Sequence, residues 1–158
     1  MHTKILTAIA AAALLAGCAH KAEQATSHSE TAQAQDMGTT SLSLQEELRA
    51  AGDRIFFDFD RSDISGEARA ILQRQAAFAS KHPELTFTIE GHADERGTRE
   101  YNLALGERRA TSDKDALAAL GVSAARLKTI SYGKERPAVV GHNEAAWAQN
   151  RRAVTVIN

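Results

Sequence analysis

Hydrophobic and polar positions follow two different periods along most of the chain, and the change of period predicts its elements. Strands are expected where β-branched and aromatic residues alternate with polar ones, at 54–60, 86–90, 127–132 and 153–157. Helices are expected where apolar residues recur every three or four positions, at 43–51, 68–81, 100–120 and 144–149. After the short first helix the order is β-α-β-α-β-α-β. It predicts an α+β sandwich with helices packed on one face of a mixed sheet.

The helix predicted from Glu100 has two candidate faces. At about 100° per residue, one set lies within roughly 60° and has polar edges, Asn102, Leu105 and Arg109. The other set spans roughly 100° on the neighbouring side and is apolar, Leu103, Ala110, Leu117 and Leu120. We assign the second set to the core. Asp113 lies near the centre of that arc, so we expect its carboxylate to reach the surface or to be paired.

The last predicted helix adds two expectations. Asn143 is a plausible N-cap, and Trp147 within the helix is expected to lie in the core. Arg151 and Arg152 follow this helix and could form an anion site. For Arg151 we favour the other interpretation, a cation that complements the C-terminal dipole of the helix.

A charged loop separates the strand at 86–90 from the long helix. Gly91 is expected to end the strand, and polar residues follow it, His92, Asp94, Glu95 and Arg96. A charged loop at a helix N-terminus is a common position for a ligand site. Asp94 and Arg109, two turns into the helix, can face one cavity, where a carboxylate and a guanidinium suit a zwitterion. The alternative is that Asp94 and Arg109 form a structural ion pair that fixes the loop.

The sequence contains no motif that predicts catalysis. We find no nucleophile elbow, no zinc-protease motif and no P-loop. A metal site at His92, Asp94 and Glu95 is the one alternative, but a further clustered His or Cys is missing and Arg96 would repel a cation. We therefore predict a non-catalytic binding module without a cofactor or a metal.

The first 17 residues have the pattern of a lipoprotein signal. Lys4 supplies a positive charge, and residues 5–16 form an apolar run that is too short to span a bilayer. Small residues then precede Cys18, which is the only cysteine, so no intrachain disulfide can form. We predict that Cys18 is acylated and anchors the mature chain, since several acyl chains together bind a bilayer stably. A plain secretory signal is the alternative.

Composition separates a tether from a single domain. Residues 18–42 are rich in Ala, Gln, Ser and Thr without periodicity, so we predict a flexible, disordered tether after Cys18. Residues 43–158 are long enough for one domain with a modest core. The whole chain of 158 residues has 19 basic and 20 acidic residues, a formal charge of −1. Because no basic excess would attract nucleic acid, none is expected as a partner.

Three segments of the predicted domain resemble one known family. They are GHADERGTREYNLALGERRA, GVSAARLKTISYGKERP and GHNEAAWAQNRRAV. These motifs are long and specific, and they closely resemble the peptidoglycan-associated lipoproteins of Gram-negative bacteria, which carry an OmpA-like domain. The resemblance covers about Arg54 to Ile157. Two positions depart from the family pattern: Ala93 stands where Thr is usual, and Asp113 stands where an aliphatic residue is usual.

The resemblance implies both a ligand and the residues that contact it. The family binds the diaminopimelate residue of the peptidoglycan stem peptide, and its aspartate and arginine ligands fall on Asp94 and Arg109. Further contacts of the family fall on Phe59, Asp60, Arg96, Asn102 and Leu105.

Location and partners are also implied by resemblance. The residue after the lipidated Cys18 is Ala19 rather than Asp, and in this the chain is similar to lipoproteins that reach the outer membrane. The implied protein is anchored there by lipid, faces the periplasm and tethers the membrane to the cell wall. It acts in the Tol-Pal system, which supports envelope integrity and cell division, and docks TolB on a surface that overlaps the wall-binding face. The alternative is a structural envelope protein that docks other periplasmic proteins, with Asp94 and Arg109 only as a brace.

Overall fold

The computed structural model describes residues 43–158. The signal at 1–17, the lipidation site Cys18 and the tether at 18–42 lie outside this range. Residues 43–51 are helical, and the elements that follow are β1 (Arg54–Phe56), α2 (Gly66–Lys81), β2 (Phe87–His92), α3 (Arg99–Ala119), the 3₁₀ turn η1 (Ala124–Arg126), β3 (Leu127–Gly133), α4 (Glu144–Asn150) and β4 (Arg152–Ile157). The predicted α+β class and the order of elements are confirmed.

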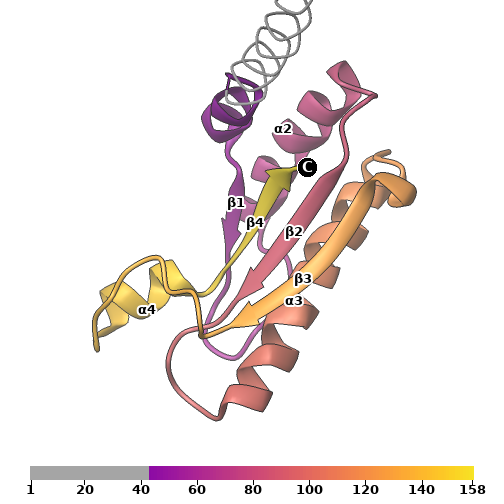
Figure 1. Ribbon diagram of the computed structural model, residues 1–158. Coiled ribbons are helices and arrows are strands. Elements are labelled where there is room, and N and C mark those ends of the chain that lie inside the picture. Colours follow the sequence, from indigo (N-terminus) through magenta and orange to yellow (C-terminus); the bar gives the residue numbers. More distant parts are fainter. Residues whose placement is uncertain (1–42) are drawn as a thin grey trace, which may run out of the picture. The chain divides into compact units, whose positions relative to one another are not determined.

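The four strands form one mixed sheet with the order β1-β4-β2-β3. β2 pairs in parallel with β3, whereas β4 lies between β1 and β2 and is antiparallel to both. Helices α2 and α3 cover one face of this sheet, and α4 lies beyond the end at which β4 begins (Figure 1). No helix within residues 43–158 is long and apolar enough to cross a membrane.

The core lies between the sheet and the two long helices. Along β2, Phe87 and Ile89 are buried while Thr88 and Glu90 are only partly covered, as expected for a strand with one packed face. Buried side chains from the other elements complete the core, including Leu48, Ile55, Leu72, Phe78, Ala110, Leu117 and Leu127. Each large apolar side chain that is fully buried contributes about 1.5–3 kcal/mol.

Capping side chains that can be recognised in the sequence mark the N-termini of three helices. The side chains of Ser65, Thr98 and Asn143 accept hydrogen bonds from the third residue of α2, α3 and α4 respectively. The predicted end of α2 at Lys81 and the predicted N-cap Asn143 are confirmed. Each cap satisfies a backbone N–H that has no partner within its helix.

A close crossing of two glycines sets the position of α3 on the sheet. A Cβ atom on Gly91 would lie 1.8 Å from the carbonyl oxygen of Gly106, and one on Gly106 would lie 2.3 Å from the Ser131 Oγ. The prediction that Gly91 ends the strand is wrong, because Gly91 pairs with both Ser131 and Ala153 inside β2. Glycine stands here because the helix backbone approaches the strand too closely for a side chain.

The same crossing explains why the predicted core face of α3 is only half right. Ala110 and Leu117 are buried, but Leu103 and Leu120 are exposed. The buried row contains the residues that we assigned to a polar-edged stripe, together with the crossing glycine: Asn102, Leu105, Gly106 and Arg109. A count of apolar side chains places the face wrongly, because the closest contact with the sheet is made by a glycine.

Asp113 lies in this row and contradicts the prediction that it is paired or exposed. Its side chain is 0 % exposed, and within residues 43–158 neither carboxylate oxygen has a hydrogen-bond partner. The surface is out of reach, because the position faces the core between Ala110 and Leu117. Burial raises the pKa of Asp113 to about 7, since a low-dielectric environment disfavours the charged form.

Candidate functional site

A small cavity lies where the segments after β1 and β2 meet the N-terminal half of α3. Its volume is about 160 Å³. The residues that line it are Phe59, Asp60, Asp94, Arg96, Gly97, Tyr101, Asn102, Leu105 and Arg109. All seven residues expected from the resemblance to contact a ligand are brought together here. Gly97 and Tyr101 were not expected.

The wall formed by Phe59 and Asp60 is positioned by an early end to β1. The strand was predicted to continue to Asp60, but it ends at Phe56. Phe57 then pairs with Arg151 instead of extending the ladder: its N–H donates to the Arg151 carbonyl at 3.0 Å, and the Arg151 Nε donates to its carbonyl at 3.0 Å. Asp60 adopts φ of 57°, an uncommon conformation for a residue with a side chain. The turn brings Phe59 and Asp60 to the rim of the cavity.

Arg109 joins three segments at the base of the cavity. Its Nε donates to the Arg61 carbonyl at 2.9 Å, its Nη1 to the His92 carbonyl at 2.8 Å and its Nη2 to the Asp58 carbonyl at 3.1 Å. These bonds use three of the five N–H groups of a guanidinium, so two remain for a ligand. Burial and the nearby Arg151 lower the pKa of Arg109 to about 10, which leaves the side chain cationic at neutral pH.

Asp94 is held by neighbouring arginines other than Arg109. Its carboxylate accepts from the Arg96 backbone N–H at 3.1 Å, Nε at 3.1 Å and Nη2 at 2.6 Å, and it lies 3.5 Å from the Arg151 Nη1. Burial alone would raise the pKa of Asp94, but the hydrogen bonds from Arg96 outweigh it, so the pKa lies below its usual value. Among residues 43–158, no ion pair within 4.0 Å joins Asp94 to Arg109, so the predicted direct brace is not formed.

Arg96 is clamped between two aromatic rings. Its guanidinium carbon lies 4.0 Å from the ring centroid of Phe59 and 4.1 Å from that of Trp147. The prediction that Trp147 lies in the core is therefore wrong: it is only partly buried and stacks on a cation. Its indole Nε1 donates to Glu95 at 2.8 Å, and the Glu95 carboxylate also lies 2.7 Å from the His142 Nδ1. Helix α4 thus fastens the loop that carries Asp94.

Arg151 also has a different role from the one its position suggested. Rather than complementing a helix dipole, its buried side chain bonds the Phe57 carbonyl, donates to Glu144 at 2.7 Å and faces Asp94. The sequence placed Arg151 about 57 residues from Asp94, and nothing in the local pattern indicated that they meet. Arg151 directly precedes β4, and Asp94 follows β2. Because β4 lies next to β2 in the sheet, the two side chains meet.

Two polar residues complete the rim. The Tyr101 hydroxyl donates to the Asp60 carboxylate across the mouth of the cavity. The Asn102 amide donates to the carbonyls of Arg96 at 2.8 Å and Thr98 at 3.1 Å. Asn102 thereby fixes the loop and keeps its amide oxygen as an acceptor, while the buried Leu105 supplies an apolar wall.

His92 does not belong to this site. It is buried in the last position of β2, with its Nε2 3.7 Å from Glu90, and no group of the described residues forms a hydrogen bond with either ring nitrogen. Burial, followed by the charge of Arg152, lowers the pKa of His92 to about 4. In the part of the chain that the structure describes, no group of three His, Cys, Asp or Glu residues is placed to hold a metal ion. The alternative of a metal site at His92, Asp94 and Glu95 is therefore not assembled there.

Comparisons with known proteins agree with this architecture. The OmpA family model matches residues 56–151. The peptidoglycan-associated lipoprotein of Agrobacterium fabrum is 51% identical over 150 residues, which cover 95% of this chain and 85% of that protein. The protein of the same name from Pasteurella multocida is 42% identical, over 96% and 95% of the two chains.

Solved structures show the same relationship. The crystal structure of the peptidoglycan-associated lipoprotein from Burkholderia pseudomallei superimposes with a TM-score of 0.66 at 46% identity, over 68% of this chain and 92% of that chain. The C-terminal domain of Helicobacter pylori MotB superimposes with a TM-score of 0.63 at 20% identity, over 67% and 84% of the two chains. The second likeness shows the shared fold alone.

Proposed function

The chain belongs to the OmpA family and, within it, to the peptidoglycan-associated lipoproteins, and on that premise we propose that it is a non-catalytic tether between the outer membrane and the cell wall. The cavity at the end of the sheet binds peptidoglycan non-covalently. The membrane end is held by acyl chains on Cys18, which lies outside the described residues. One observation supports the wall-binding half most: Asp94 and Arg109 are both buried, face one cavity and do not pair with each other.

The size of the cavity indicates how much of the polymer it receives. A volume of about 160 Å³ is smaller than the 300 Å³ or more typical of pockets that enclose a whole drug-sized ligand. It suits the end of one side chain. Diaminopimelate presents an ammonium and a carboxylate at its far end, so a single end group carries both charges that the cavity can complement.

The mechanism assigns one charge to each buried residue. The ligand carboxylate accepts from the two N–H groups of Arg109 that the backbone carbonyls leave unused. The ligand ammonium donates to Asp94, which accepts three hydrogen bonds of the roughly four that a carboxylate can take. The Asn102 amide, which also lines the cavity, keeps its oxygen as a neutral acceptor. A diaminopimelate end therefore satisfies groups that are already positioned.

Calorimetry on the full-length chain tests this assignment. A stem peptide that contains diaminopimelate should bind, and the same peptide with lysine in its place should bind at least tenfold more weakly. The lysine analogue lacks the carboxylate and leaves Arg109 N–H groups unsatisfied at the base of the cavity. Equal affinity for both peptides would remove the ligand role of Arg109. If neither peptide bound, the protein would instead be assigned to the alternative function, a structural envelope protein that docks other periplasmic proteins.

The anchor is tested separately. Cys18→Ser should remove the protein from the outer-membrane fraction, because acylation of this residue is the proposed attachment. Fractionation in high salt measures the effect, since salt removes proteins held only by charge. A Cys18→Ser protein that still fractionates with the membrane would contradict the lipid anchor. We also propose, from the family alone, that the protein acts with the Tol system and docks TolB. Co-purification of the wild-type chain with TolB tests that partner.

A further inference from the structure

An open groove lies between α4 and the segment that runs from the end of β1 into α2. Its volume is about 750 Å³, compared with about 160 Å³ for the cavity, so it has room for more than the end of one side chain. None of the residues that line it also lines the cavity. We call it the acidic groove, and its chemical character comes from Phe56, Asp58, Asp63, Glu67, Ala145 and Ala148.

The accessible charge of the acidic groove is negative. Asp58, Asp63 and Glu67 are all exposed. Asp63 lies 2.8 Å from the Arg61 Nε, but within residues 43–158 the carboxylates of Asp58 and Glu67 have no ion-pair or hydrogen-bond partner. Among the described residues that line the groove only Arg151 is basic, and it is buried and already ion-paired. Two uncompensated carboxylates therefore favour a cationic occupant.

Apolar side chains accompany these carboxylates in the groove. Phe56, the last residue of β1, is 44% exposed. Ala145 and Ala148 add small apolar side chains from α4. Isolated apolar side chains are common on any protein surface, whereas apolar side chains that share one groove with polar residues mark a site that binds another molecule. Aromatic residues in particular are enriched at the centres of protein interfaces.

We propose that the acidic groove docks a basic segment of a partner protein. Lysine or arginine side chains of the segment meet Asp58 and Glu67, and an apolar side chain beside them covers Phe56. A metal ion does not fit these observations, because it would leave Phe56 exposed. In addition, no group of three His, Cys, Asp or Glu residues within 43–158 is placed to hold one.

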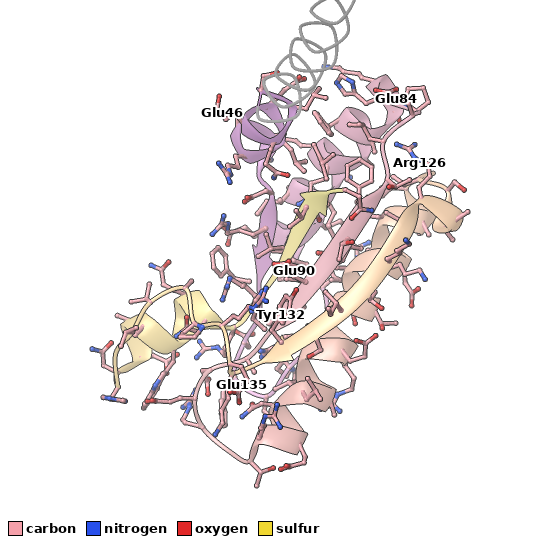
Figure 2. The ribbon with its side chains drawn as sticks, viewed as in Figure 1. Glu46, Glu84, Glu90, Arg126, Tyr132 and Glu135 are labelled. Carbon is pink, nitrogen blue, oxygen red and sulfur yellow. The ribbon has the colours of Figure 1, made fainter. Side chains whose placement is uncertain are left out.

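Anionic occupants are disfavoured by the charge of the groove. Lipid phosphates would be repelled, and so would residues 18–42 of the chain itself, which contain one basic and three acidic residues. Those residues also precede the helix that carries Glu46, and this helix lies at the opposite end of the domain from α4 (Figures 1 and 2). If two copies met groove to groove, the carboxylates of each would face those of the other.

Site-specific photocrosslinking in cells that make the full-length chain tests the proposal. A benzophenone amino acid replaces Phe56 on β1 or Ala145 on α4, so that the probe enters the groove from two elements. The matched control carries it at Leu120, an exposed apolar residue that follows α3 and does not line the groove. We expect both groove positions to give an adduct with the same protein and Leu120 to give none. Mass spectrometry should identify a crosslinked peptide with a net positive charge.

Charge reversal then tests the chemistry of the contact. Glu67→Lys should lower the adduct yield from the Phe56 position at least about fivefold, because repulsion between like charges replaces an ion pair. The matched control is Glu100→Lys, which should leave the yield unchanged. Glu100 is exposed in the first turn of α3 as Glu67 is in α2, so both variants lose the same favourable interaction with a helix dipole.

Melting temperatures within a few degrees of wild type would show that the variants fold. Glu67→Gln, which removes the charge without reversing it, should give an intermediate yield and carries the test if Glu67→Lys melts lower. Adducts within one chain, between two copies or with lipid, an acidic crosslinked peptide, or the absence of an adduct would each overturn the proposal. A yield that both Glu67 variants leave unchanged, or that Glu100→Lys lowers equally, would overturn it as well.

Discussion

Arg109 and Asp113 lie one turn apart on the same row of α3, and both side chains are 0 % exposed, but their surroundings are opposite. Arg109 donates to three backbone carbonyls at the cavity end of the helix. Asp113, at the core end, has no hydrogen-bond partner. One helix therefore carries a buried charge that assembles a site and another that only costs stability. Burial by itself does not show whether a charged side chain supports a site or destabilises the fold. Its hydrogen-bond partners do.

The variant with the largest expected effect should disturb the surroundings of Arg109 and Asp113 together, because both residues lie on α3. Gly91→Ala places a Cβ atom 1.8 Å from the Gly106 carbonyl oxygen, which is backbone and cannot rotate away. We expect a loss of more than about 3 kcal/mol in the free energy of unfolding, because overpacking against backbone forces α3 off the sheet. Thermal or urea denaturation measures the loss.

The control for that variant is Gly66→Ala. A Cβ atom at Gly66 meets nothing within 4 Å, and the residue begins α2. Its stability should stay within about 0.5 kcal/mol of wild type. If Gly91→Ala were equally mild, the two glycines would not be what fixes the distance between α3 and β2.

At the core end, Asp113→Val should stabilise the protein. In the folded state the pKa is raised to about 7, so the folded protein binds a proton that the unfolded chain releases above about pH 4. Stability contributed by Asp113 is therefore lost as pH rises from about 4 to 7. Above pH 7 the valine variant should be more stable by about 3 kcal/mol, as measured by urea denaturation.

The pH dependence of this gain in stability tests whether the buried carboxyl group of Asp113 is its cause. The advantage of the valine variant should shrink toward pH 4 and level off below it, where the carboxyl group is protonated in both states of the wild-type protein. A gain that is the same at pH 4 and pH 8, or a fall in the melting temperature, would show that Asp113 has a partner.

At the cavity end, the expected effect is on binding. Asp94→Asn keeps the shape but removes the charge that receives the ligand ammonium. A hydrogen bond to a charged group is worth about 1.5–3 kcal/mol, so binding to purified sacculi should weaken at least about tenfold. Arg109→Lys should weaken binding similarly and also lower the melting temperature, because one ammonium cannot reproduce bonds to three carbonyls.

Asp63→Asn is the matched control. Asp63 is exposed, is paired with Arg61 and does not line the cavity. Its binding should match wild type. Wild-type binding by Asp94→Asn would show that the aspartate fixes the loop and does not contact the ligand.

The smallest expected effect concerns the clamp on Arg96. Trp147→Leu removes one of the two rings that sandwich the guanidinium. A cation–π contact at a partly exposed site is worth about 0.5–1 kcal/mol, so binding should weaken roughly two- to fivefold. Trp147→Phe keeps a ring, although a weaker one, and should recover most of the affinity. Equal loss in both variants would assign the effect to the indole hydrogen bond with Glu95 instead.

The sequence predicted what local physics controls. Alternation located the strands, helical spacing located α2 and α3, and the predicted end of α2 at Lys81 and N-cap at Asn143 are confirmed. The seven expected cavity residues came from the resemblance, since they lie on three separate segments that no single period connects. Their proximity in the structure is confirmed, whereas their binding of a ligand stays a prediction.

What the sequence could not predict depends on distance in space. Gly91 was taken for a strand breaker because a glycine pattern does not reveal a helix crossing above it. Trp147 and Arg151 were assigned by local rules, but their partners, Arg96 and Asp94, lie about 50 residues earlier. Asp113 was expected to find a partner on general energetic grounds, and α3 leaves it none.

His92 and Asp113 make opposite contributions to the protons that unfolding exchanges with the solvent. Between about pH 5 and 6 the folded protein keeps a neutral imidazole, pKa about 4, and a neutral carboxyl group, pKa about 7. The unfolded chain in that range has a charged imidazole and a carboxylate, because both groups return to their ordinary pKa values. On unfolding, Asp113 therefore releases one proton and His92 takes up one, so this pair exchanges no net proton with the solvent. If the unfolding enthalpy is measured in buffers of different ionisation enthalpy, this pair should therefore not contribute to any difference between the measured values.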